Sequence, residues 1–445
     1  MEPNTLLDAI LDEAGMSRLG LATRLNLASQ ARGRATSYDH TSVIRWLKGQ
    51  RPRGSVPDLI CEILTERLGR LVTLEDIGMG TPATPEPGAA PLDSFIEQST
   101  AFWRGDQNQR PDLREVPVIT GLRAVGPVWE WENPPDERDV SRPGTLRVST
   151  ADVSMLRVAR RHYEQMYRKA GGVATRPRII RFLTVETAPI LRGSYTDAIG
   201  RELHRAVGGL VAIAGICSYD SDSQGLAQRY FHQALRLAKA SGDRGFGGYV
   251  IALLVNQCLY LREYRQAVAF AEAAVRTAGQ HISPALATDI YAMQAKAYAR
   301  VGDQTSAHRC MTLAETAVGR IRRDEEPDET GYVQPGLVEA QFADALLRLG
   351  DLHPAQEYAR EAVRVQSHTR GRAHRLATLT DIELLSGEGE RAAGTAAEML
   401  ETVQGMESRR LRDRLVTVRN SLVSHGGGAT QEVAELIDDV LGLPV

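Results

Sequence analysis

Cysteine and long apolar runs are scarce in this 445-residue sequence. The four cysteines, Cys61, Cys217, Cys258 and Cys310, lie far apart and form no C-x-x-C pair. No run of about 18 apolar residues is present to cross a bilayer, and the N-terminus lacks the basic-then-apolar pattern of a signal peptide. We therefore expect a soluble, cytoplasmic protein with reduced thiols and no membrane partner, in which Cys217 and Cys258 are small core residues.

Signatures of catalysis and of metal binding are also missing. The sequence contains no G-x-x-x-x-G-K-[ST] and no H-E-x-x-H, and its glycine runs at 245–248 and 426–428 are not set between a strand and a helix. The histidines are scattered singly, and His40 has no second residue at a metal-ligand spacing. We expect a protein that is not an enzyme, with no catalytic residue, no metal and no cofactor.

Charge is nearly balanced over the chain but unevenly distributed along it. The formal net charge is -3. Between Arg18 and Arg53 there are eight basic residues and one acid, Asp39, so this segment carries +7 and the remainder carries -10. A basic window in an acidic chain is typical of a duplex-binding domain attached to a body that repels nucleic acid.

The basic window contains a segment, residues 38–53, that is typical of a DNA recognition helix. Asp39 can accept hydrogen bonds from the amides that open a helix, and Gly49 with Pro52 ends it. Apolar residues at positions 43, 46 and 47 would form the buried face. The predicted base contacts are His40, Thr41, Ser42 and Arg45. The predicted phosphate contacts are Arg18, Arg32, Arg34, Lys48, Arg51 and Arg53. The alternative is a helical interaction domain whose basic residues are only solvated.

Helix starts and proline-rich stretches divide the chain into four parts. Residues 1–79 are predicted to form a compact domain of short helices, which begin near Asn4, Ser17, Asp39 and Pro57. The proline-rich segment 80–91 is predicted to be an extended linker.

The third part, residues 92–148, is predicted to be a small connector after one short amphipathic helix. Its segments 116–118, 125–131 and 145–148 are candidate short strands, and its tryptophans are expected to pack onto neighbouring helices. Residues 149–445 are predicted to be a helical repeat domain, and Ser149 with Asp152 resembles the capping box of its first helix.

The repeats are indicated by small residues at regular spacing. Intervals of 40, 40, 48 and 38 separate Ala227, Ala267, Ala307, Ala355 and Ala393. The long interval contains the charged segment 323–331, which we expect to be an exposed insertion. Glycine-containing turns at 241–243, 301–303, 349–351 and 386–388 are expected to share one register. Helix pairs of this length must stack to bury their apolar faces, which predicts a right-handed superhelix closed by residues 409–441.

A superhelix of this kind binds along its concave side, which the first helix of each pair lines. Counting back eleven and seven residues from each small residue places polar side chains on that side. The predicted groove residues are Asn256, Tyr260, Lys296, Arg300 and Arg348. An amide there could hold a peptide backbone, and the cations could hold a carboxylate or phosphate. The alternative is that these are ordinary polar residues on a solvated wall.

Two stretches carry a resemblance to known families. Leu21-Ala22, followed by Thr41-Ser42-Val43-x-Arg45-Trp46-x-x-Gly49-x-x-Pro52, resembles the core pattern of XRE-type (Cro/C1-like) helix-turn-helix domains. Leu47 stands where many members have Glu, and residues 26–38 occupy the place of a much shorter turn. The placement of Ala and Gly after residue 200 is similar to that of tetratricopeptide repeats with longer helices.

Over nearly its whole length the chain resembles the actinobacterial XRE/tetratricopeptide regulators of development and antibiotic production. Segments 125–129, 152–157 and 227–238 look like recurrent stretches of that group. More distantly, the chain is similar to the RRNPP (Rap/Rgg/PlcR-type) regulators of Gram-positive bacteria. The resemblance implies a nucleoid-associated homodimer that binds double-stranded DNA and responds to a signalling peptide, small molecule or protein partner.

We therefore expect an all-α protein with an N-terminal XRE-like helix-turn-helix domain, a small irregular or short-strand connector and a C-terminal tetratricopeptide-like superhelix. The expected function is sequence-specific transcription regulation, in which the repeat domain dimerises and senses a peptide, a small anionic ligand or a protein partner. The alternative function is a protein-binding adaptor with a helical-repeat groove and weak or no DNA binding.

Overall fold

The computed structural model describes residues 3–31, 36–52, 56–68, 72–74, 76–79, 91–110, 113, 116–133, 137–366 and 368–442. These residues form helices joined by turns, and their only β-type pairings are two isolated bridges, Arg142 with Tyr195 and Arg147 with Ser194. The predicted all-α class is therefore confirmed for the described residues. None of their helices combines the length and the hydropathy of a membrane-spanning segment.

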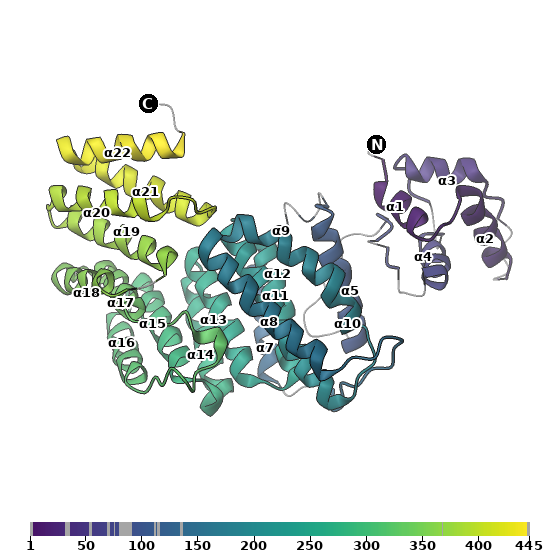
Figure 1. The fold of residues 1–445 in the computed structure, drawn as a ribbon, viewed down its shortest axis with the longest axis horizontal. Coiled ribbons are helices and arrows are strands. Elements are labelled where there is room, and N and C mark those ends of the chain that lie inside the picture. The colour runs from purple at the N-terminus through teal and green to yellow at the C-terminus, as the bar shows by residue number, and fades with distance from the viewer. Residues whose placement is uncertain are drawn as a thin grey trace. The chain divides into compact units, whose positions relative to one another are not determined.

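The chain divides into two compact units, Met1–Leu113 and Arg114–Val445, referred to below as the N-terminal and the C-terminal unit. Figure 1 shows the N-terminal unit in purple to blue. Its helices are α1 (Thr5–Glu13), α2 (Arg18–Ala31), α3 (His40–Leu47), α4 (Val56–Leu68) and α5 (Leu92–Gln107). Asn4, Ser17 and Asp39 each accept a hydrogen bond from the backbone amide three residues later, which confirms these predicted helix starts.

One hydrophobic core extends through residues 7–79 of the N-terminal unit. The backbone amide of Asn4 donates to the carbonyl of Leu47 at 2.7 Å, and its side-chain Nδ2 donates to the carbonyl of Ile77 at 2.8 Å. The first residues of this domain are thereby fixed to the end of α3 and to the last segment of the core. The core side chains from α2 and α3 are Leu21, Ala22, Leu25, Val43 and Trp46.

Asn26 on α2 fixes the segment that leads into α3. Its Nδ2 donates to the carbonyl of Tyr38 at 2.8 Å, and its Oδ1 accepts from the Tyr38 amide at 2.9 Å and from the Thr36 hydroxyl at 3.0 Å. The Tyr38 ring lies edge-on to Trp46, with centroids 5.4 Å apart. The helix α2 continues to Ala31, so the first part of the stretch 26–38 is helical.

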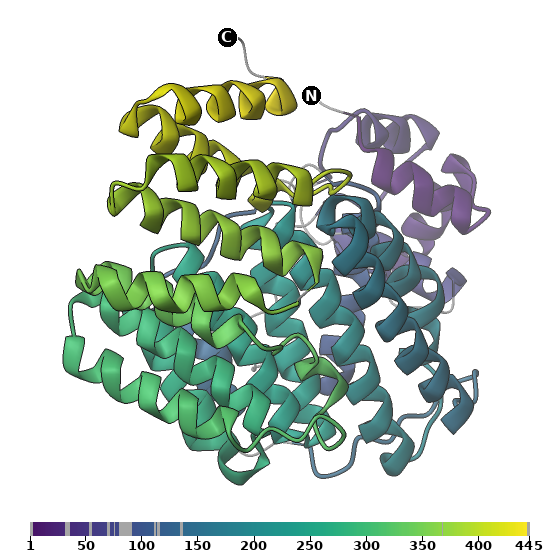
Figure 2. The same cartoon turned by 60° about the vertical axis from the view of Figure 1, so that its left-hand side comes forward.

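The C-terminal unit begins with α7 (Leu122–Glu132), α8 (Thr150–Ala170), α9 (Gly172–Phe182), the π-helical η1 (Leu183–Thr187) and α10 (Ala188–Leu191). Five helix pairs follow: α11 (Asp197–Asp220) with α12 (Gln224–Ser241), α13 (Arg244–Tyr260) with α14 (Tyr264–Ala278), α15 (Pro284–Val301) with α16 (Gln304–Val318), α17 (Leu337–Leu349) with α18 (Leu352–Arg364), and α19 (Thr369–Leu385) with α20 (Gly389–Thr402). A sixth pair, α21 (Arg409–His425) with α22 (Gly428–Leu441), ends the described part of the unit. Figure 2 shows the later pairs as successive layers, with α21 and α22 in yellow at the end. The predicted capping box of Ser149 and Asp152 is confirmed at the start of α8.

Each of the five pairs begins its second helix in the same way. The predicted small residues Ala227, Ala267, Ala307, Ala355 and Ala393 are all buried. Just before each of them, one turn residue has a positive φ: Asp222 (60°), Arg262 (65°), Gly302 (81°), Gly350 (88°) and Gly387 (76°). A left-handed residue ends a helix and lets the chain reverse within a few residues. The expected turn at 241–243 is in a different register, because it joins α12 to α13 and therefore connects two pairs.

The expected strand at 125–131 is wrong, because these residues lie in α7. Their valines and tryptophans suit a strand, but tertiary packing overrides that preference. Val128 and Trp131 are buried, and α7 packs against α12 and α14. Of the other two expected strands, 116–118 forms no ladder and 145–148 forms only the single bridge at Arg147.

A buried ion network joins early and late helices of the C-terminal unit. Asp220, the last residue of α11, has no exposed side-chain surface and forms an ion pair with Arg370 of α19. Its Oδ2 accepts from the Gly172 amide at 2.7 Å, and its Oδ1 accepts from the Ser408 hydroxyl at 2.7 Å. The Ser408 oxygen also accepts from Arg370 Nη1 at 2.9 Å. One carboxylate therefore holds together α9, α11, α19 and the start of α21.

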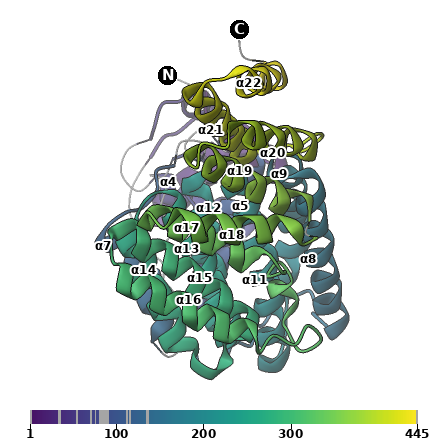
Figure 3. The ribbon, with the colours of Figure 1, turned by 90° about the vertical axis from the view of Figure 1, so that its left-hand side faces the viewer.

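The segment 319–336, between α16 and α17, folds back onto the unit. Glu329, which is 6% exposed, forms ion pairs with Arg205 of α11 at 2.9 Å and with Arg160 of α8 at 3.5 Å. Asp328 pairs with Arg161 of α8 at 3.2 Å. Figure 3 shows this segment running beside α11 and α8. The predicted exposed insertion is therefore wrong at Glu329 and Thr330, because arginines of two helices neutralise the acid that is buried there.

Replacement of Asp220 by alanine is expected to lower the free energy of unfolding of the C-terminal unit by about 3 to 5 kcal/mol, because Arg370 would remain buried without its carboxylate. Urea unfolding followed by circular dichroism measures this loss. Glu361→Ala is a matched control, since its pair with Arg364 is exposed and should contribute less than about 1 kcal/mol. Equal losses in the two variants would contradict a structural role for the Asp220 network.

Two buried histidines should make the fold sensitive to acid. His204 and His232 are buried, and burial, together with nearby arginines, lowers the pKa of each to about 3. Both are neutral in the folded protein, whereas the unfolded chain takes up protons near pH 6.5. Stability should therefore be fully present above that pH and fall below it by about 1.4 kcal/mol per pH unit for each histidine. Between pH 7.0 and 5.5, urea unfolding should show a smaller loss of unfolding free energy for His204→Leu than for the parent. Equal losses in the two proteins would refute the buried histidine as the origin of the acid sensitivity.

Candidate functional site

The first candidate site is the surface around α3 in the N-terminal unit. His40, Thr41 and Arg45 are exposed on α3, and Lys48 and Arg51 are exposed just after it. Neither α2 nor α3 contains an acidic residue, whereas the exposed acids of this domain include Asp8, Asp12 and Glu13 on α1. The exposed charged side chains of α2 and α3 are therefore all basic, and the acid Asp39 stands at the N-cap of α3.

Ser42 differs from the other predicted base contacts, because its side chain is 7% exposed. Its hydroxyl donates to Asp39 Oδ1 at 2.9 Å and its amide donates to the same oxygen at 2.8 Å. The Ser42 hydroxyl oxygen in turn accepts from the Asp39 amide at 3.5 Å, which completes the capping box that starts α3. Ser42 therefore positions the helix rather than standing on the exposed surface. Arg45 lies one turn further along, with Nη2 3.4 Å from the Ser42 hydroxyl oxygen.

The predicted phosphate contacts fall into two groups. Arg18, Lys48 and Arg51 are exposed. Arg18 lies 3.8 Å from Asp8, but both side chains are half exposed, so this pair is weak. Arg32, Arg34 and Arg53 lie outside the described residues.

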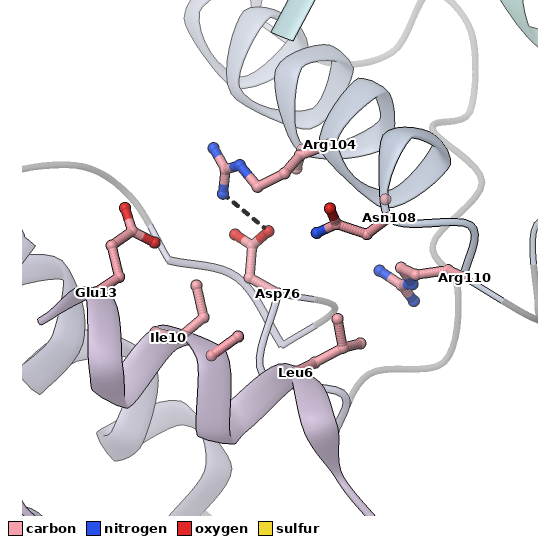
Figure 4. A pocket seen from close by; sticks show the side chains of 10 residues that line it. Leu6, Ile10, Glu13, Asp76, Arg104, Asn108 and Arg110 are labelled. Carbon is pink, nitrogen blue, oxygen red and sulfur yellow. Dashed lines mark hydrogen bonds and ion pairs between the residues drawn. The ribbon is translucent and has the colours of Figure 1, made fainter. Parts of the chain in front are cut away.

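A small cavity of about 80 Å³ lies in the N-terminal unit between α1 and α5, as shown in Figure 4. Leu6 and Ile10 of α1 line one side, and Arg104 of α5 lies opposite them. Arg104 Nη1 is 3.3 Å from the buried carboxylate of Asp76. The cavity is too small for an organic ligand. It marks the place where α5 contacts the core of residues 7–79.

The second candidate site is a groove of about 670 Å³ in the C-terminal unit, a volume typical of ligand pockets. The first helices of the repeat pairs, together with α8, α21 and the segment before α17, line it. All five predicted groove residues face this one space: Asn256 and Tyr260 from α13, Lys296 and Arg300 from α15, and Arg348 from α17. The structure brings them together as the repeat spacing predicted, and their binding role stays a prediction.

Asp344 occupies the centre of the predicted cations. Its carboxylate lies 3.3 Å from Lys296 Nζ and 3.1 Å from Arg300 Nη2. Burial of this carboxyl opposes its ionisation, but Lys296, Arg300 and Arg348 outweigh burial and lower its pKa to about 2. The group is therefore three cations around one carboxylate, which leaves a net positive charge.

A second carboxylate in the groove belongs to Asp289 of α15. Burial raises its pKa to about 6, and it accepts a 2.6 Å hydrogen bond from the hydroxyl of Tyr332. Tyr332 comes from the segment 319–336, which therefore supplies part of the groove wall. Nine Arg and Lys side chains and five Asp and Glu side chains line the groove, so its net charge is opposite to that of the chain.

The opposite wall holds functional groups that the repeat spacing did not predict. Arg370 and His374 come from α19, and Arg410 and Arg414 come from α21. The guanidinium of Arg410 lies 4.2 Å from the ring centroid of Tyr219 and 5.0 Å from that of Tyr260, so it stacks over both. Residues 409–441 were expected to serve only as a cap. The paired arginines at its start were the one signal in the sequence for a further role.

The part of the chain that the structure describes contains no cluster of His, Cys, Asp or Glu that could hold a metal ion. All four cysteines are buried. Burial raises the pKa of the Cys258 thiol to about 12, and a thiol of that kind is unreactive at neutral pH.

Comparison with known families matches part of the N-terminal unit. The family described as the SP15 N-terminal domain matches residues 7–80. This span coincides with the core of residues 7–79, so the match concerns the compact domain of the N-terminal unit. None of the curated proteins matches the chain.

Asp344→Asn should destabilise the C-terminal unit by roughly 2 kcal/mol at pH 7. The folded-state pKa of Asp344 is about 2 against an ordinary value of 3.8, so ionisation of this group favours the folded state. This contribution is present above about pH 4 and is lost as the pH falls toward 2. In urea unfolding, the difference in unfolding free energy between the parent and Asp344→Asn should be smaller at pH 3 than at pH 7. Asp351→Asn, at a carboxyl that is 38% exposed, is the control, and an equal loss there would contradict the role of the cation cluster.

Proposed function

We propose that this chain is a sequence-specific DNA-binding transcriptional regulator. Its domain of residues 1–79 would be an XRE-type helix-turn-helix, and its C-terminal unit a tetratricopeptide-like superhelix that dimerises and senses a ligand. The observation that carries the proposal is a capped α3 that exposes His40, Thr41 and Arg45 and that, like α2, contains no acidic residue.

The dimensions and anchoring of α3 suit a recognition helix. It has eight residues, which corresponds to a length of about 12 Å, close to the width of the major groove. Val43 and Trp46 hold one side of it in the core, and the Asp39 cap fixes its first turn. The exposed side chains of that turn and the next, above all Thr41 and Arg45, would then reach base edges.

Electrostatics supports the same surface. The segment from Arg18 to Arg53 carries +7, and the rest of the chain carries -10. Lys48 and Arg51 lie at the end of α3, where a duplex with its bases against the first turns would bring its phosphate backbone. The acidic remainder would discourage non-specific binding elsewhere on the protein.

The C-terminal unit supports a sensing role. Its stacked helix pairs surround a groove of ligand size with an excess of cations. In the mechanism that we propose, two chains dimerise so that two recognition helices bind two half-sites of a promoter. A peptide, a small anionic ligand or a protein partner in the groove would then shift the dimer between arrangements with different affinity for DNA.

The second function that the groove favours is a protein-binding adaptor, in which the N-terminal domain binds DNA weakly or not at all. Salt separates the two functions. Counterion release would make the affinity of a regulator for duplex DNA fall steeply as salt rises, whereas an adaptor would retain no duplex.

Arg45→Ala is expected to cost about 1 to 3 kcal/mol at a specific site and much less on random duplex, because it removes a base contact. Arg51→Ala is expected to weaken both DNAs alike, because it removes a phosphate contact. Fluorescence anisotropy with labelled duplexes between 50 and 200 mM KCl measures both effects.

Arg322→Ala is the control for these variants, since it removes an exposed arginine of the C-terminal unit and should leave DNA affinity unchanged. Equal losses for Arg45→Ala and Arg51→Ala on specific and random DNA would refute the division into base and phosphate contacts. No salt-dependent binding by the parent would favour the adaptor.

A further inference from the structure

Three polar atoms in the groove, one each from α11, α19 and α21, are buried without a partner among the described residues. The Tyr219 hydroxyl, His374 Nε2 and Arg410 Nε make no hydrogen bond with any described residue. All three side chains line the groove. A buried polar group without a partner is costly, and native proteins rarely leave several together unless something else satisfies them.

Arg410 is held in place by aromatic rings rather than by an acid. Its guanidinium stacks on Tyr219 and Tyr260, whose ring centroids are 5.5 Å apart and nearly perpendicular. Stacking fixes the plane of the guanidinium and leaves its edge available for hydrogen bonds. Among the described residues, no carboxylate forms an ion pair with Arg410.

The surroundings of these atoms are strongly cationic. His374 faces Arg370 on its own helix, Arg410 and Arg414 on α21, and Lys296 on α15. Burial, followed by these four cations, lowers the pKa of His374 well below its usual value, so the imidazole is neutral.

Acids of the protein already neutralise three of the four cations. The pairs are Arg370 with Asp220, Arg414 with Asp381 at 2.8 Å, and Lys296 with Asp344 at 3.3 Å. Arg410 is the exception among them, and it lies beside the unpartnered imidazole and hydroxyl. The missing partner is therefore an anion with acceptor oxygens.

We propose that Arg410, His374 and Tyr219 form the subsite for the anionic group, a carboxylate or a phosphate, of a small organic ligand that binds in the groove. Arg410 would supply charge and planar donors, and the Tyr219 hydroxyl and His374 Nε2 would donate to the remaining oxygens. The groove extends beyond this subsite to Asn256 and Arg348, which leaves room for the rest of the ligand. This inference rests on the proposed sensing function and names the class of ligand that it needs.

Anion binding to the full-length protein tests this subsite, with inorganic phosphate and acetate as probes and chloride as the reference at constant ionic strength. The rise in melting temperature with probe concentration gives the dissociation constant. Arg410→Gln should weaken binding of the stabilising probe about tenfold or more, and Arg410→Lys should recover part of the loss. Arg409→Gln is the matched control, because Arg409 is the neighbouring arginine on α21, is exposed and does not line the groove.

Either probe can support the subsite, and the probe that stabilises identifies the group. Stabilisation by acetate alone assigns a carboxylate, and stabilisation by phosphate alone assigns a phosphate. Absence of any anion-specific stabilisation of the parent would overturn the proposal, as would equal binding by Arg410→Gln and Arg409→Gln. The anion-binding experiment contains no DNA, so its result does not depend on DNA binding. Failure of the protein to select DNA in a separate experiment would overturn the proposed regulator function and would leave the anion subsite standing or falling on the anion-binding result.

The pH dependence provides a second readout that a purely structural role for His374 would not give. A bound anion offsets the four cations and favours the protonated imidazole, so binding should take up a proton. The affinity for acetate should therefore rise as the pH is lowered from 7.5 to 5.5 in the parent and stay nearly constant in His374→Gln. The same pH dependence in both proteins would overturn the assignment of His374.

Discussion

The buried carboxylate of Asp220 is the constraint on which the C-terminal unit depends. A carboxylate without exposed surface is tolerated only when its charge and lone pairs are all satisfied, and here Arg370, Ser408 and the Gly172 amide satisfy them. Gly172 is required at this point, since an added Cβ would lie 2.6 Å from the Cβ of Asp220. The network holds the start of α21 beside α11 and α19, and this arrangement places Arg410 over the rings of Tyr219 and Tyr260. The groove therefore depends on an ion pair between residues 150 positions apart in the chain.

The distribution of charge suits the two units to different kinds of proposed partner. The α3 surface presents exposed cations, which suit a polyanion that binds by counterion release. The groove presents cations that are partly buried and mostly paired with acids, which suits selective recognition of one small anion. The two proposals therefore rest on separate observations, although both partners are negatively charged.

Local features of the fold could be predicted from the sequence, because each depends on a few neighbouring residues. The cap at Asp39, the capping box at Ser149 and the buried alanines of the repeats are of this kind. The repeat spacing also predicted that Asn256, Lys296 and Arg348 lie in one groove, because equivalent positions of stacked helix pairs face the same side. Features that depend on distant partners could not be predicted. Glu329 is buried because Arg160 and Arg205 neutralise its charge. The helix α7 packs against α12 and α14 and buries Val128 and Trp131, whereas Val125 and Trp129 stay exposed.

The most direct test of the central claim is selection of bound fragments from a genomic DNA pool by the full-length protein, with the Thr41→Ala, Arg45→Ala double variant selected in parallel. The two proteins differ only at exposed positions of α3, so any difference in the selected DNA reports on that surface. We expect one shared, two-fold symmetric motif for the parent and a loss or change of that motif for the variant. Absence of any enriched motif with the parent, or the same motif at the same enrichment with both proteins, would contradict the claim that α3 reads DNA sequence.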